Sequence, residues 1–254
     1  MAARLELGEK LHRPRMVAAL HEGFAPMPTG FKYAKANDIE SLSAAIDDSC
    51  CAVMIELVQG EGGVIALERD FTEAITALVQ EKELLLLIDE VQTGNGRTGT
   101  LFAFEQYDIA PDIVTTAKGL AGGLPLGAAL FGSRTSNTLS PGTHGSTFGG
   151  NPACCAGALH VLSRIDERLL AEVRAKAAHI RGRLGDCPGV RSVTGLGLML
   201  GVETTRPAGE VVGECLEQGV ALLTAKHKLR LLPALNIPWE LLDRGLDVVR
   251  RVCG

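Results

Sequence analysis

Two side chains with complementary chemistry, Asp89 and Lys118, each end a short apolar run of the sequence. Such runs are typical of buried strands, and parallel strands present their carboxyl ends at one edge of a sheet. We therefore expect both side chains to point into the same crevice. A lysine amine forms a Schiff base with an aldehyde and can later move an α-proton, and a carboxylate favours protonation of a nearby ring nitrogen. This pair suits a pyridoxal 5'-phosphate site.

Two other motifs near Asp89 point to different ligands. The segment GNGRTG at 94–99 satisfies the G-x-G-x-x-G dinucleotide fingerprint, which should follow its strand directly, but residues 90–93 intervene. The segment LLLLIDE at 84–90 resembles the Walker B strand of an ATPase. That site also needs a G-x-x-x-x-G-K-[ST] loop, and no Gly-Lys pair occurs in the chain. We therefore favour the aspartate–lysine pair over a nicotinamide, flavin or nucleotide site.

Glycine is unusually frequent, at 30 of 254 residues, and it is concentrated in loops around the predicted strand ends. Glycine-rich loops lie at 59–63, 92–99 and 118–123, and a fourth at 144–152 precedes a long predicted helix. Glycine lets the backbone turn tightly or approach a ligand closely. Because ligands of open α/β sheets sit at the carboxyl ends of strands, the loops predict a ligand site rather than mere flexibility.

The elements that position these residues alternate between helices and strands from Asp38 onward. Asp38 is expected to cap a helix over 39–47, and apolar spacing predicts another helix over 71–80. Helices between apolar strands predict an α/β fold in which a parallel sheet is covered on both faces. Buried strands are expected at 51–57, 84–89, 112–117 and 127–132.

The regular alternation of helices and strands ends after a long helical stretch over 153–165. A smaller α+β unit is expected beyond it. We predict an irregular N-terminal remnant over 1–37, part of a large domain over 38–165, and a small domain over 166–254. The small domain is expected to contain helices at 168–184, 208–218 and 238–252, with strands at 190–195, 197–203, 220–224 and 229–233.

Composition excludes several classes of protein. The net charge is −5, with 25 basic and 30 acidic residues, so no basic field favours nucleic acid. The longest aliphatic run, at 84–88, is far shorter than the roughly 20 residues of a membrane helix, and the first residues lack a signal-peptide core. Seven cysteines without a CxxC motif predict reduced thiols, no metal site and a cytoplasmic location.

Five segments, in this order and spacing, resemble the class III (fold-type I) pyridoxal phosphate aminotransferases, and within them the acetylornithine branch. They are ELVQGEGG, DEVQTGNGRTG, TTAKGL, HGSTFGGNP and RLLPAL. The segments ALNIP and NPACCAGAL are weaker markers of that branch. The resemblance runs from about Phe24 onward. It implies part of an aspartate aminotransferase-like large domain with a mostly parallel sheet, plus a small α+β C-terminal domain.

The resemblance also implies an activity and residue roles. The activity would be transfer of an amino group from N-acetylornithine, or a similar acylated diamino acid, to 2-oxoglutarate in arginine biosynthesis, by a homodimer. Lys118 would form the Schiff base and Asp89 would pair with the pyridine nitrogen. The remaining roles would be Val91 on the ring face, Gln92 near the ring hydroxyl, Thr147 at the cofactor phosphate of the partner subunit, Arg230 on the substrate α-carboxylate, and Glu56 and Glu61 on the substrate side. In related enzymes one such glutamate pairs with the arginine while the site is empty.

Several of these residues have a purely structural alternative. We expect His144 to be a structural histidine and Arg97 to hold the glycine loop in place. The structural alternatives are a solvated strand end for Lys118, a turn or helix cap for Asp89, an exposed ion pair for Arg230, a turn hydroxyl for Thr147, and solvated carboxylates for Glu56 and Glu61.

The start of the chain departs from the family. Members carry a long N-terminal portion with a small-residue phosphate loop, an aromatic residue that stacks on the pyridine ring, and further substrate contacts, and none of these strings occurs here. The chain therefore resembles the C-terminal two-thirds of such an enzyme. An alternative function is a truncated, inactive subunit that cannot hold the cofactor tightly. The motifs do not separate acetylornithine from succinylornithine, succinyl-diaminopimelate or ornithine as the amino donor.

Overall fold

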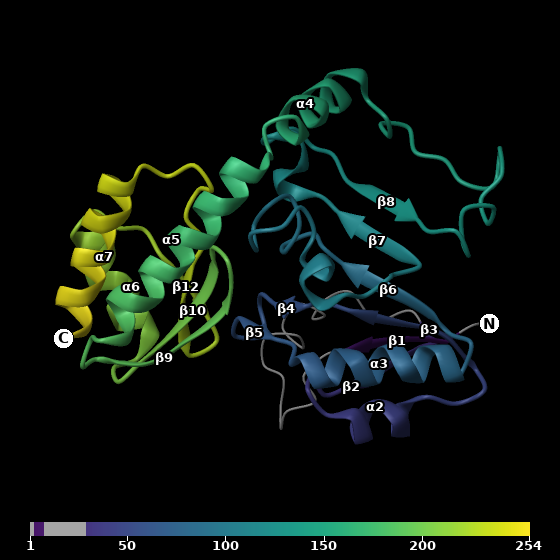
Figure 1. Ribbon diagram of the computed structural model, residues 1–254, viewed down its shortest axis with the longest axis horizontal. Helices are drawn as coiled ribbons and strands as arrows, with labels where there is room; N and C mark the ends of the chain where they lie inside the picture. Colours follow the sequence, from purple (N-terminus) through teal and green to yellow (C-terminus); the bar gives the residue numbers. More distant parts are fainter. Residues whose placement is uncertain (1–2, 8–28) are drawn as a thin grey trace. The chain divides into compact units, whose positions relative to one another are not determined.

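A computed structural model describes residues 3–7 and 29–254 of the chain, and of residues 3–7 it describes only the backbone (Figure 1). The chain divides into two compact units. Unit 1 comprises residues 1–57, 67–91 and 104–158, and unit 2 comprises residues 58–66, 92–103 and 159–254. Unit 2 thus includes two segments, 58–66 and 92–103, that were predicted to belong to the large domain.

Unit 1 is built on one six-stranded sheet, whose order is β2-β1-β3-β6-β7-β8. Its strands are β1 (Ala3–Leu7), β2 (Phe31–Ala34), β3 (Cys50–Ile55), β6 (Leu85–Asp89), β7 (Ile113–Thr116) and β8 (Ala128–Phe131). All neighbouring pairs are parallel except β7 and β8, which are antiparallel. The prediction of a mostly parallel α/β sheet is therefore confirmed.

Two features of this sheet differ from the sequence-based expectation. Strands β1 and β2 lie within residues 1–37, which were expected to be irregular because of their prolines and glycines; residues 1–2 and 8–28 of that stretch are outside the described part. Strand β8 runs antiparallel to β7 because only the short 3-10 turn η2 (Lys118–Ala121) and a loop connect them, and a parallel crossover needs a longer connection.

Helix α3 (Arg69–Glu81) supplies the apolar face that the spacing of its sequence predicts. Phe71, Ile75 and Val79 recur at helical intervals and are buried, as are alternate leucine and isoleucine side chains of β6. Helix α2 (Ile39–Ala45) begins as predicted after Asp38, whose carboxylate accepts a hydrogen bond from the Ser41 backbone at 2.9 Å. Burial and capping thus explain why these two segments form helices.

Unit 2 contains a four-stranded antiparallel sheet, in the order β11-β12-β10-β9, with three helices on one of its faces (Figure 1). The apolar faces of these helices and strands form one buried core. The predicted α+β elements of this part of the chain are therefore present. They are α5 (Glu167–Gly185), β9 (Val190–Leu196), β10 (Met199–Thr204), α6 (Ala208–Glu217), β11 (Leu223–Ala225), β12 (Lys228–Leu231) and α7 (Trp239–Cys253). Helix α4 (Pro152–Leu162) precedes them.

Arg97 explains why the loop 92–103 belongs to unit 2. Its guanidinium donates hydrogen bonds to the carbonyl oxygens of Leu198 and Pro233, the first at 3.1 Å, and its own carbonyl accepts one from the Leu198 backbone. Burial lowers the pKa of this guanidinium. The expectation that Arg97 holds the glycine loop in place agrees with these contacts.

Four of the seven cysteines are buried, two are half-buried and Cys51 is exposed. All seven are free thiols, and Cys187, Cys215 and Cys253 lie in the core of unit 2. Burial raises the pKa of Cys253 to about 11, so its thiol stays neutral near pH 7. Over residues 3–7 and 29–254, no group of histidine, cysteine and acidic side chains could hold a metal ion, and no helix is long and apolar enough to cross a membrane.

Candidate active site

The ends of β6 and β7 bring three polar residues together in unit 1. Asp89 is the last residue of β6, and the parallel register pairs it with Thr115 of β7. The Glu90 backbone extends this pairing with a hydrogen bond of 2.8 Å to the Thr115 carbonyl oxygen. Lys118 follows two residues after β7 and begins the turn η2. The carboxyl edge of the sheet therefore carries a carboxylate, a hydroxyl and an amine.

One of the two oxygen atoms of the Asp89 carboxylate accepts a hydrogen bond from the chain's own backbone. Its Oδ1 atom accepts a hydrogen bond of 2.9 Å from the Val91 backbone, which is the turn-capping contact that the structural alternative predicts. Its Oδ2 atom has no hydrogen-bond partner within residues 3–7 and 29–254. One oxygen thus orients the carboxylate and the other is left for a ligand.

Lys118 lies in a backbone conformation that non-glycine residues adopt infrequently. Its φ angle is +50°, in the left-handed region, and the side chain is exposed. Strain of this kind persists where the surrounding structure imposes it, and it is frequent at functional sites. No carboxylate of the described chain forms an ion pair with Lys118, so its amine is available for chemistry.

Thr115, which is paired with Asp89, was not among the predicted site residues. Its Oγ1 atom is buried and has no hydrogen-bond partner in the described part of the molecule. Paired residues of neighbouring strands project to the same face, so this hydroxyl shares the face of Asp89. An orphaned buried hydroxyl beside a half-engaged carboxylate fits a polar ligand group, such as a substituted pyridine. The only signal in the sequence was the position of this threonine, three residues before Lys118.

Unit 2 contains a second cluster, formed by Arg230 of β12 and Glu61 of the turn between β4 (Val58–Gln59) and β5 (Ile65–Ala66). The two side chains form a close ion pair. Only 10% of the Arg230 side chain is exposed, against 48% for Glu61, and the Arg230 Nε atom is buried without a hydrogen-bond partner in the described residues. A buried guanidinium with an unused donor is suited to binding a carboxylate.

The other predicted site residues are less informative. Glu56 and Val91 are half-buried in unit 1, and Gln92 is half-buried in unit 2, where Gly60 leaves room for it: a Cβ on Gly60 would lie 2.5 Å from the Gln92 Oε1 atom. Thr147 and His144 are exposed and form no hydrogen bond within the described residues. The structure therefore shows neither the turn-hydroxyl role considered for Thr147 nor the structural role expected of His144.

The predicted residues are thus divided between the units. Unit 1 contains Glu56, Asp89, Val91, Lys118 and Thr147, and unit 2 contains Glu61, Gln92 and Arg230.

The sequence matches one protein family over nearly its whole length. Residues 14–253 match the family model for aminotransferase class III. The chain is 48% identical over 235 residues to the acetylornithine aminotransferase of Haemophilus ducreyi, covering 91% of this chain and 60% of that protein. It is 42% identical to the acetylornithine aminotransferase of Aquifex aeolicus, covering 91% and 61%. The chain thus spans about three-fifths of the length of these relatives.

Solved structures show the same likeness. The N-acetylornithine aminotransferase of Stenotrophomonas maltophilia matches with a TM-score of 0.80 and 32% identity, over 99% of this chain and 65% of that one. The ornithine aminotransferase of Toxoplasma gondii, described with partial occupancy of PLP at its active site, matches with a TM-score of 0.87 and 29% identity, over 99% and 64%.

Proposed function

Because this chain belongs to the class III aminotransferase family, we propose that it transfers an amino group from N-acetylornithine, or a similar acylated diamino acid, to 2-oxoglutarate. The observation that carries the proposal is the strand register that sets Asp89 beside Thr115, with Lys118 just beyond. The names of the curated relatives support acetylornithine as the amino donor, and the reaction would serve arginine biosynthesis.

The cofactor of this proposal is pyridoxal 5'-phosphate, which when bound supplies an electron sink for charge that develops at the reacting carbon. Lys118 would hold the cofactor covalently through its amine and move the proton on the carbon that bears the substrate amine. Asp89 would keep the ring nitrogen protonated, because an opposite charge nearby favours the charged form. Val91 would contact the ring face, and Gln92 would donate a hydrogen bond near the ring hydroxyl.

Substrate binding would depend on Arg230. Its guanidinium would hold a substrate carboxylate through two parallel hydrogen bonds, and Glu61 would occupy the arginine when no substrate is bound. Glu56 would line the substrate side. The proposed location is the cytoplasm, where a reducing environment keeps the seven thiols free.

A test of this proposal compares amino donors and an Arg230 variant. We expect the purified protein, supplied with pyridoxal 5'-phosphate, to form glutamate fastest from N-acetylornithine in a panel that includes ornithine, succinylornithine and succinyl-diaminopimelate. Arg230→Lys should raise KM for 2-oxoglutarate about 10- to 100-fold, because a lysine cannot form two parallel hydrogen bonds. Arg191→Lys, on an exposed arginine of β9, is the control. If none of these amino donors gave glutamate, the proposed reaction would be wrong. If KM for 2-oxoglutarate were unchanged in Arg230→Lys, the proposed role of Arg230 would be wrong.

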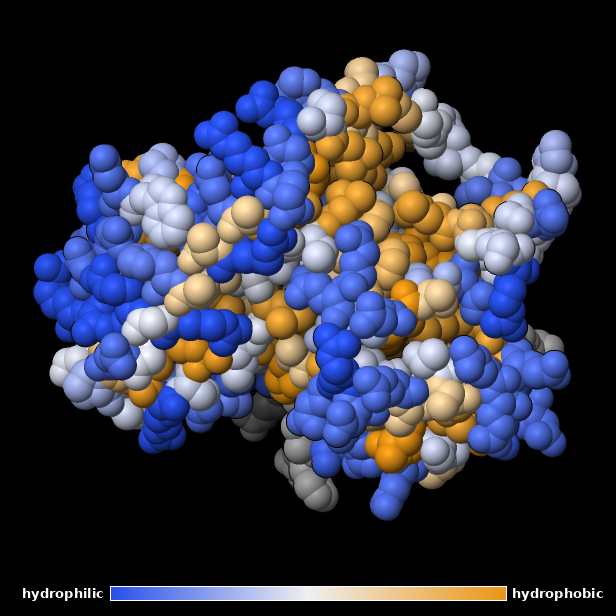
Figure 2. Space-filling view, viewed as in Figure 1, coloured by the Kyte–Doolittle hydropathy of each residue, from blue (hydrophilic) through white to orange (hydrophobic). Residues whose placement is uncertain are grey.

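We also propose that the protein is a homodimer in which Thr147 reaches the cofactor phosphate of the partner subunit. The support is the exposed surface of unit 1: all four residues of β8 are exposed although each is apolar, and Phe148 beside Thr147 is exposed as well. Figure 2 shows apolar side chains gathered over β7 and β8. Light scattering should give the mass of two chains, and a monomer at micromolar concentration would exclude this arrangement.

A further inference from the structure

The turn that carries Glu61 contains a strained residue, Val64. Its φ angle is +52°, in the left-handed region, and its side chain is completely buried. This conformation is an outlier for a β-branched residue, and it persists only where the surroundings impose it. The contacts of Val64 therefore show what holds the turn in place.

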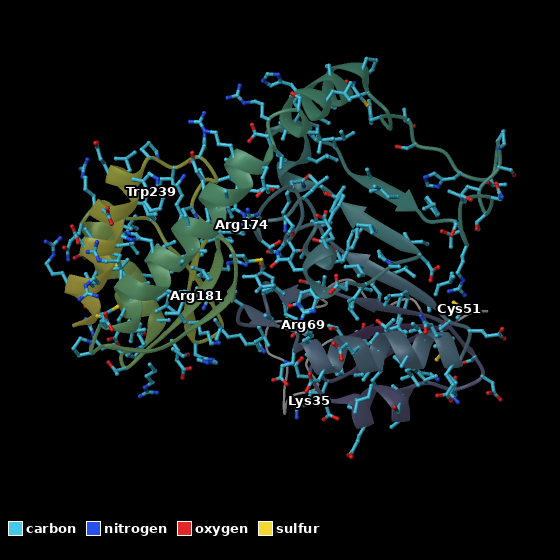
Figure 3. All side chains as sticks on the ribbon, viewed as in Figure 1. Lys35, Cys51, Arg69, Arg174, Arg181 and Trp239 are labelled. Atoms are coloured by element: carbon cyan, nitrogen blue, oxygen red, sulfur yellow. The ribbon has the colours of Figure 1, made fainter. Side chains whose placement is uncertain are left out.

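Two strands of the unit 2 sheet are shaped to receive Val64. Thr194 of β9 donates a hydrogen bond of 2.8 Å from Oγ1 to the Val64 carbonyl oxygen. Gly195 and Gly201 provide the space for the valine side chain. A Cβ on Gly195 would lie 2.9 Å from Val64 Cγ1, and a Cβ on Gly201 would lie 2.8 Å from Val64 Cβ. The backbone on either side of Thr194 is also anchored, because Arg181 donates hydrogen bonds to the Val193 and Gly195 carbonyl oxygens. Arg181 lies on α5, as Figure 3 shows.

Strand register links this receiving surface to Arg230. Gly201 of β10 is paired with Arg230 of β12 on one side and with Thr194 of β9 on the other. Because paired residues share a face of the sheet, Val64 lies over the gap that Gly201 leaves between the arginine and the threonine. The ion pair between Glu61 and Arg230 thus forms beside the point where the turn is held.

A buried lysine completes the arrangement. Lys228 of β12 is 7% exposed, and its Nζ atom donates a hydrogen bond of 3.0 Å to Thr194 Oγ1. An ammonium group can only donate, so the single hydroxyl proton of Thr194 must go to a carbonyl oxygen. The Val64 oxygen at 2.8 Å is closer than the Gly201 oxygen at 3.4 Å. Lys228 therefore directs the Thr194 hydroxyl toward Val64. The proposed reaction gives this lysine no other task.

We propose that Thr194 and Lys228 are positioning residues that hold the 60–64 turn so that Glu61 pairs with Arg230, and that they thereby limit the affinity for substrate carboxylates. The consequence for substrate rests on the proposed function of Arg230. A substrate carboxylate must displace Glu61, and a rigidly held turn strengthens the pair that has to be broken. Loosening the turn should therefore increase substrate affinity, whereas simple structural damage to the site would decrease it.

The test uses Thr194→Val, which keeps the shape of the side chain and removes the hydroxyl, and Thr194→Ser, which keeps the hydroxyl. Backbone amides of residues 58–66 should exchange hydrogen about tenfold faster in Thr194→Val, and at nearly the wild-type rate in Thr194→Ser. Lys228→Met should give a smaller increase, since the hydroxyl remains. Thr76→Val removes a hydroxyl with a similar backbone contact in α3 of unit 1, at 2.9 Å, and should leave this segment unchanged.

Calorimetric measurement of 2-oxoglutarate binding to the same proteins tests the second claim, that Thr194 and Lys228 limit the affinity for substrate carboxylates. The dissociation constant should fall about two- to fivefold in Thr194→Val, the effect expected for weakening one ion pair, and Glu61→Gln should abolish the difference. Equal exchange rates in wild type and Thr194→Val, or an affinity that is unchanged or lower, would overturn the proposal. If the wild-type protein did not bind 2-oxoglutarate, the role of Arg230 would be wrong, and the claim that Thr194 and Lys228 limit substrate affinity would be overturned with it. The exchange rates would then separately decide whether the two residues hold the turn.

Discussion

Replacing Lys118 with alanine is expected to lower amino-group transfer by about 10³-fold or more and to remove the absorbance of covalently held cofactor. The proposed mechanism assigns this amine two tasks, covalent attachment of the cofactor and movement of the substrate proton, and each contributes a large factor to the rate. Spectra of the purified protein with pyridoxal 5'-phosphate and single-turnover formation of glutamate measure the two tasks separately.

Lys118→Arg separates chemistry from charge. An arginine keeps the positive charge just beyond β7, but it stays protonated and does not act as the nucleophile, so it should be as inactive as alanine. Lys82→Ala, on an exposed lysine at the end of α3, should leave both measurements unchanged. Full activity in Lys118→Ala would show that another residue holds the cofactor, and would remove the main support for the proposed site.

Asp89→Asn is expected to lower turnover by about 10²-fold or more while leaving the fold intact. An amide oxygen can still accept the hydrogen bond that Val91 donates to Oδ1, so the turn after β6 should keep its shape. The amide carries no negative charge, however, and a ring nitrogen that loses an opposite charge nearby should have its pKa lowered by about 1–3 units. The cofactor would then be a weaker electron sink, which slows the proton-transfer step.

The measurement for this variant is turnover together with a spectral pH titration of the bound cofactor. Asp108→Asn is the control, because that side chain is 91% exposed and, among the residues that the structure describes, forms only a long ion pair with Arg69. Thermal unfolding of Asp89→Asn should stay close to that of the wild type. If turnover also stayed within about twofold of the wild type, Asp89 would have a capping role only.

Much of unit 1 could be predicted because its strands are short apolar runs with clear ends. The run that ends at Asp89 alternates buried and half-buried side chains in the sheet, as a covered strand should. The direction of β8 could not be predicted, because its sequence is as apolar as that of a parallel strand and only the length of the connection decides its pairing. The positions of β1 and β2 were also missed, since local glycine and proline content says nothing about pairing with distant strands.

By itself, the sequence determined which residues have reactive groups and which of them lie at or just beyond the end of a strand: Asp89 and Lys118 follow from local patterns of apolar residues and glycine. Only the tertiary structure decided which groups meet. Arg230 and Glu61 are 169 positions apart, and the hydrogen bond from Thr194 to Val64 spans 130. Such contacts depend on strand register and on the space that Gly201 leaves, and neither is encoded in a local pattern. The orphaned hydroxyl of Thr115 likewise became visible only when burial and hydrogen bonds could be followed atom by atom.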